Sequence, residues 1–177
     1  MAKITLITNS QIKKTVKNYE KDEFIDLLLD VVQACPQARE FLTMKFTDNQ
    51  SDILEKYKQK VRCEFYPASG FGRLNLREAK KAMSDFKKLS TNKNMVIDLM
   101  LYYVECCVEF TNEYGDINEA FYYSAVSVYS QAVNEVNILG ASAYERFAKR
   151  LEAVVNDTSG IGWGFHDNLH DIYYELV

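Results

Sequence analysis

In this chain of 177 residues, the fold follows from the stretch Met95-Val-Ile-Asp-Leu-Met-Leu-Tyr-Tyr-Val-Glu-Cys-Cys-Val-Glu-Phe-Thr-Asn-Glu113. Most of its side chains are apolar or aromatic, which favours a helix buried on nearly every side. Its acidic residues Asp98, Glu105, Glu109 and Glu113 recur at intervals of seven and four, so they share one edge of that helix. We therefore expect a central buried helix with a single acidic edge.

Helical patterns with clear start and stop signals flank this stretch on both sides. Ser10, Ser51, Asp116 and Ser142 are the expected N-caps, and Pro36 suits the first position of its helix. The remaining helices are predicted at residues 10–18, 22–35, 36–46, 51–65, 76–89, 116–140, 142–156 and 165–176.

The fold class that follows is all-α, a single array or bundle of about seven to eight helices built from antiparallel helix pairs. Residues 4–7 suit a short extended piece, but one isolated strand has no partner. The clearest internal break is at residues 66–72, and it separates a net basic segment, residues 1–66, from a helical core, residues 67–177. With 47% hydrophobic residues, the chain suits one compact domain with a substantial core.

Charge is distributed unevenly along the sequence. Residues 1–93 carry 18 basic and 12 acidic residues, a net charge of +6, whereas residues 94–177 carry 3 and 13, a net charge of −10. Such a split fits an anionic partner for the first half, and equally fits attraction between the halves or ordinary solvated surfaces. The sequence pI of about 5.3 argues against general binding to a nucleic-acid backbone.

The four cysteines and the hydropathy indicate a cytoplasmic protein with no membrane segment. No C-x-x-C spacing occurs, and Cys106 and Cys107 point about 100° apart on a helix, so reduced thiols are expected. Both lie in an apolar helix, where burial makes a thiol unreactive, so covalent catalysis has little support. No apolar run is long enough to span a bilayer.

Two glycine corners, Ser69-Gly-Phe-Gly72 and Ser159-Gly-Ile-Gly162, share one pattern, and each leads into a helix. Unpaired N–H groups at a helix start suit an anion, and basic residues follow the first corner, chiefly Arg73, Arg77, Lys80 and Lys81. The alternative is structural: the glycines end one helix and the apolar residue between them fills a gap.

The second corner is the richer one, because the only tryptophan and both histidines lie in or just after it. Three alternating glycines exceed what a helix stop requires. Our candidate binding residues here are Ser159, Gly160, Gly162, Trp163, Gly164, His166 and Asp167. Trp163 is the expected aromatic wall, the backbone of residues 160–164 the hydrogen-bond donor set, and His166 a polar contact.

A metal site is a further hypothesis. His166 and His170 are four residues apart, which is the spacing of the paired ligands in H-E-x-x-H sites, with Asp167 in place of the glutamate. A third ligand has to come from the central helix, and Glu109 is the favoured residue, with Glu105 and Glu113 beside it. In the structural alternative, the glutamates simply form the solvent-exposed edge of that helix.

Three segments carry a resemblance to a known family. They are Glu64-Phe-Tyr-Pro-Ala-Ser-Gly-Phe-Gly-Arg-Leu74 through Leu89, Val108-Glu-Phe-Thr-Asn-Glu-Tyr-Gly-Asp-Ile-Asn118, and Asp157-Thr-Ser-Gly-Ile-Gly-Trp-Gly-Phe-His-Asp167. Over residues 50–177 the chain resembles a family of bacterial proteins of unknown function. The resemblance implies a small cytosolic helical protein and no particular chemistry.

Together these patterns favour a non-catalytic binding or adaptor module that recognises an unknown protein or a small anionic ligand at residues 159–167, with no cofactor. One alternative is a metal-dependent hydrolase that uses a divalent transition metal on His166, His170 and a central-helix carboxylate. A second is a binder of an anionic partner through the basic helix at residues 73–88.

Overall fold

The computed structural model describes residues 6–70 and 74–176, and the part that it describes is all helical, as predicted. Nine helices lie in those residues, one for each predicted range and slightly more than the seven to eight given for the bundle as a whole. The chain divides into two compact units, residues 1–47 and 48–177. Residues 48–66 belong with the second unit because their helix packs on the helices that follow it.

The first unit contains three helices, α1 (Asn9–Val16), α2 (Lys21–Ala34) and α3 (Pro36–Phe46). Helix α1 begins one residue after Thr8, whose hydroxyl accepts from the Gln11 backbone in a capping box, so Ser10 is not the cap. Pro36 does occupy the first turn of α3, as expected. Val32 and Met44 are the buried apolar residues in the described part of this unit.

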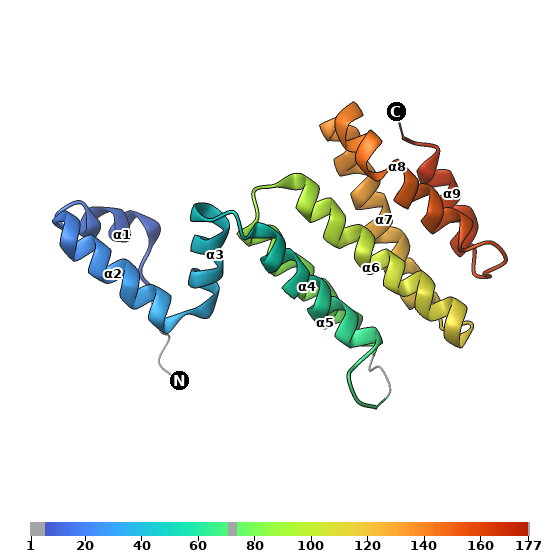
Figure 1. Cartoon of the computed structure of the whole chain (residues 1–177), viewed down its shortest axis with the longest axis horizontal. Helices are drawn as coiled ribbons and strands as arrows, with labels where there is room; N and C mark the ends of the chain where they lie inside the picture. The colour runs from blue at the N-terminus through green and yellow to red at the C-terminus, as the bar shows by residue number, and fades with distance from the viewer. Residues whose placement is uncertain (1–5, 71–73, 177) are drawn as a thin grey trace. The chain divides into compact units, whose positions relative to one another are not determined.

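The second unit is built around α6 (Lys93–Tyr114), whose bounds agree closely with those of the central helix predicted at residues 95–113. Helices α4 (Gln50–Phe65) and α5 (Leu76–Leu89) lie on one side of α6. Helices α7 (Glu119–Leu139), α8 (Ala141–Asn156) and α9 (Phe165–Tyr173) lie on the other, as Figure 1 shows.

Buried tyrosines fix how α7 sits between its neighbours. The hydroxyls of Tyr103 on α6 and Ser124 on α7 are 2.8 Å apart, and both side chains are buried. Tyr129 on α7 donates to the carbonyl of Leu151 on α8 at 3.0 Å. Each phenol thus satisfies its polar atom while its ring fills the core, which a fully buried tyrosine requires.

The other three predicted N-caps are also wrong, because in each case the N-cap position falls on another residue nearby. Asn118 caps α7 through its side chain, and Asp116 instead accepts from the Tyr122 hydroxyl at 3.1 Å. Gly140, at φ +77°, ends α7 and directly precedes α8, so Ser142 lies inside the first turn. Helix α4 starts at Gln50, one residue before Ser51.

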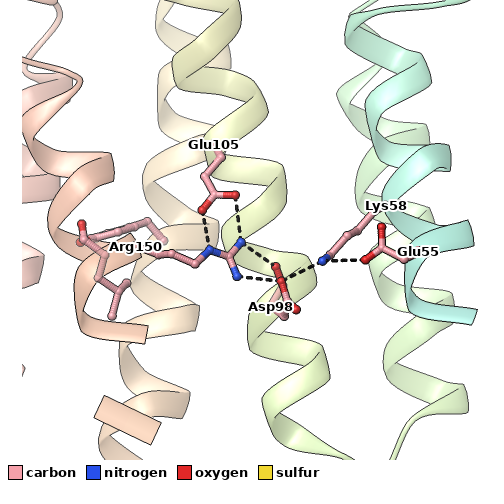
Figure 2. Close-up of polar contacts among 7 residues, drawn as sticks. Glu55, Lys58, Asp98, Glu105 and Arg150 are labelled. Carbon is pink, nitrogen blue, oxygen red and sulfur yellow. Dashed lines mark hydrogen bonds and ion pairs between the residues drawn. The ribbon is translucent and has the colours of Figure 1, made fainter. Parts of the chain in front are cut away.

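Ion pairs tie the acidic edge of α6 to helices on both sides (Figure 2). Arg150 of α8 donates to Asp98 at 2.7 Å and to both carboxylate oxygens of Glu105 at 2.7 and 2.9 Å. On the other side of Asp98, Lys58 of α4 lies 3.2 Å away and also pairs with Glu55. These half-buried charges link α4, α6 and α8, so this part of the edge is structural rather than merely solvated.

None of the helices in the described residues combines the length and hydropathy that crossing a membrane requires.

Candidate recognition turn after helix α8

The candidate site begins where α8 ends, at a histidine that closes the helix. The Nδ1 atom of His166 lies 3.1 Å from the carbonyl oxygen of Val155 and 3.1 Å from the Thr158 hydroxyl. Thr158 is fully buried, and its hydroxyl donates to the same Val155 carbonyl at 2.7 Å. The network fits a proton on Nδ1, with Nε2 as the remaining acceptor. His166 therefore satisfies a carbonyl at the C-terminal end of α8.

A tight turn at residues 162–165 follows and leads into α9. The N–H of Phe165 donates to the Gly162 carbonyl at 3.1 Å, which closes a four-residue turn. Both central residues have positive φ, +61° for Trp163 and +65° for Gly164. A turn with two such residues has the signature of type I′, which glycine and asparagine normally occupy. Trp163 is therefore a strained choice at its position.

Buried side chains on α9 anchor the turn from the inside. Phe165 is fully buried, with its ring centroid 4.8 Å from that of Tyr122 on α7, and Leu169 is fully buried one helical turn later. The Asn168 side chain donates to the Gly164 carbonyl at 2.6 Å. The turn is thus held by packing and hydrogen bonding that do not involve the indole.

The Trp163 side chain points into solvent, with 61% of the residue exposed. In the described part of the chain, the N–H groups of Gly160, Gly162, Trp163 and Gly164 donate to no protein acceptor. These N–H groups therefore lie beside an exposed indole. His166 directs its Nδ1 atom into the end of α8.

The remaining predicted binding residues differ in where they lie. Ser159 and Asp167 are exposed beside the turn, and Asp167 occupies the first turn of α9, where a carboxylate is favoured by the helix dipole. Arg77 is exposed in the first turn of α5 and belongs to a separate part of the unit. Arg73 lies outside the described residues.

The structure does not bring the three candidate metal ligands together. The ring centroids of His166 and His170 are 6.1 Å apart, and the His170 ring packs 4.6 Å from that of Tyr174. Arg62 of α4 binds both carboxylate oxygens of Glu109, at 2.9 and 3.0 Å, and this pairing lowers the pKa of Glu109. Within residues 6–70 and 74–176, no group of three or more His, Cys, Asp or Glu side chains could hold a metal ion.

The thiols follow the sequence prediction. Cys106 and Cys107 are buried, whereas Cys35 and Cys63 are exposed, and all four are free. Burial raises the pKa of the Cys106 thiol to about 12. A thiol with such a pKa is protonated and unreactive at neutral pH, so Cys106 is a core residue.

Sequence reasoning missed the partners that fix the site. It did not identify Thr158, which stands beside the glycine corner and hydrogen-bonds to His166. It also did not identify Arg62 and Arg150 as the hydrogen-bond partners of Glu109 and Glu105. One signal was available, because residues 94–177 hold only three basic residues and Arg150 is one of them. An arginine in so acidic a half has many carboxylates with which to pair.

The fold and the site define an all-helical protein with an exposed aromatic turn near its C-terminus. Residues 7–176 match the DUF6155 family, described as a family of unknown function, and the chain belongs to that family. No curated protein and no solved structure matches the chain.

Proposed function

We propose that this protein is a non-catalytic recognition module that binds a protein partner through the turn at residues 162–165. Trp163 is the contact residue, and its indole enters an apolar pocket on the partner. The observation that carries the proposal is the conformation of Trp163, which combines a positive φ with 61% exposure.

The fold itself does not require a tryptophan at position 163. A glycine would adopt the same backbone conformation without strain, and Trp163 has no side-chain hydrogen bond or ring contact in the described part of the chain. Strained residues persist where the surrounding structure holds them, and they cluster at binding sites. Tryptophan is also among the residues most enriched at the energetic centres of protein interfaces.

The backbone supports the same partner chemistry. The N–H groups of residues 162–164 flank the indole and are available to a carbonyl or carboxylate on the partner. The anchored side chains of Phe165 and Asn168 hold the turn before binding. A pre-ordered loop binds with a smaller loss of conformational entropy than a flexible one.

Trp163 is the only tryptophan, so its fluorescence reports on the site directly. The first step is to capture partners from a lysate of the source cell with the wild type and with Trp163→Ala. Tyr123→Ala is the matched control, because Tyr123 is a 75% exposed aromatic residue on α7.

Addition of the purified captured partner should then shift the Trp163 emission to the blue and protect it from iodide quenching. We expect Trp163→Ala to lose the partner and Tyr123→Ala to retain it. Equal capture by all three proteins, or an unchanged emission in the complex, would refute the proposal.

A further inference from the structure

A second site lies in the gap between α5 and α7, where residues of α6 also line it. Helix α6 packs extensively on both α5 and α7, whereas α5 and α7 have little direct contact with each other. A cavity of about 280 Å³ occupies this gap. Near one end, Glu135 of α7 accepts from Lys93 with both oxygens at 3.0 Å, and Lys87 lies 3.9 Å from it.

The inner walls of this cavity are apolar. Phe86 of α5, Leu99 and Met100 of α6, and Val128 of α7 contribute to them, and each of these residues is at most 6% exposed. Met83 of α5 adds a second thioether. Methionine side chains adapt to irregular shapes, so walls with two of them accommodate a flexible chain.

The rim of the cavity is polar and cationic. Lys80, Ser84 and Lys87 recur at four- and three-residue steps along α5, so they form one row at the edge of the cavity. Gln131 faces them from α7, and its amide nitrogen is already bonded to the Ser127 carbonyl. Lys87 and Lys93 both pair with Glu135, so these three charges sum to +1, and Lys80 adds a second positive charge to the rim.

An apolar interior with a few polar groups at its edge is the usual form of a small-molecule site. From this combination we infer that the cavity binds a free monocarboxylate with a short linear alkyl chain. The chain lies among the methionines, and the carboxylate lies between Lys80 and Lys87 with Ser84 as a hydroxyl donor. At about 30 Å³ for each non-hydrogen atom, the cavity holds on the order of ten such atoms, the size of octanoate.

The test uses octanoate and protein labelled with ¹³C at the methionine methyl groups. The chain has five methionines, of which Met83 and Met100 line the cavity and Met44 lies in the first unit as an internal reference. We expect saturable shifts of the two cavity methyls and none at Met44. 1-Octanol, which has the same chain length without the charge, should bind about tenfold more weakly.

Two variants separate this site from non-specific adsorption. Lys80→Gln with Lys87→Gln should weaken octanoate binding about tenfold, whereas Lys81→Gln with Lys88→Gln removes the same charge from outside the cavity and should leave it unchanged. Ser84→Trp places a large side chain at the rim from an exposed position, so folding is preserved and binding should be lost.

The inference fails if the cavity methyls do not shift at millimolar octanoate, or if octanol binds equally well. It also fails if the control lysine pair weakens binding as much as the rim pair, or if Ser84→Trp binds like the wild type.

Discussion

The strain at Trp163 can be measured by comparing Trp163→Gly with Trp163→Ala. Both substitutions remove the whole indole, which is largely exposed. They differ only in the Cβ, which alanine retains at φ +61° and glycine lacks. The difference in stability between the two variants thus isolates the backbone from the side chain.

Two opposing effects set the expected difference in the free energy of unfolding between the two variants. A non-glycine residue in the left-handed region loses roughly 1–2 kcal/mol in the folded state. Glycine has a more flexible unfolded chain, which offsets about 0.4–1 kcal/mol of that gain. We therefore expect Trp163→Gly to be more stable than Trp163→Ala by about 0.5–1 kcal/mol.

The assay is urea unfolding followed by far-ultraviolet circular dichroism, because the variants lack the only tryptophan. Equal slopes with different midpoints show a change in stability alone. The control is the same pair of substitutions at Tyr123, an exposed position inside α7, where glycine should be less stable than alanine by about 1 kcal/mol. If Trp163→Gly is no more stable than Trp163→Ala while the Tyr123 pair shows its expected sign, Trp163 is not strained.

Three further results follow from the same structure. Arg150→Leu should lower the free energy of unfolding by about 2–3 kcal/mol in urea titrations, because it leaves the half-buried carboxylates of Asp98 and Glu105 without their arginine. Substitution of the exposed neighbour, Lys149→Leu, should change the free energy of unfolding by less than about 0.5 kcal/mol. Equal effects of the two substitutions would contradict a stabilising role of the Arg150 ion pairs. A thiol reagent at pH 8 should modify two cysteines in the native protein and four in urea, since burial raises the pKa of Cys106 to about 12, and four fast thiols would contradict that burial. Because the hydrogen bonds from Arg62 lower the pKa of Glu109, this ion pair stabilises the fold above the ordinary glutamate pKa, and the stabilisation is lost as the pH falls through the lowered pKa. Glu109→Gln should therefore reduce the free energy of unfolding by up to about 1 kcal/mol at pH 7, and its difference from the wild type should disappear in acid unfolding titrations.

The helices could be predicted because their signals are local. The apolar run of α6, the proline at the start of α3 and the glycine after α7 each determine structure within a few residues. The cap residues could not be predicted as well. Asp116 and Asn118 both suit an N-cap, but Asn118 is the N-cap of α7. The Asp116 carboxylate instead accepts a hydrogen bond from the hydroxyl of Tyr122, which lies on α7.

The position of the glycine corner could be predicted, but the hydrogen bonds and ion pairs around it could not. The glycine spacing predicted a corner at residues 159–164, because glycine is the residue that most readily adopts the positive φ angles found there. The partners of the polar groups were not visible, because they come from elsewhere in the chain. Arg62 lies 47 residues before Glu109, and Arg150 lies 45 residues after Glu105. Those pairings exist only once α4 and α8 pack beside α6.

The C-terminal corner divides into two halves with different physical roles. Thr158, Phe165 and His166 face inward, and they close α8 and anchor α9 without any contribution from the indole. Trp163 faces outward at a position where glycine would suit the backbone better. Since the inward half already fixes the turn, folding alone does not explain the tryptophan. The binding role that we propose would explain it, because the exposed ring would become buried against the partner and the fixed turn would limit the entropy lost on binding.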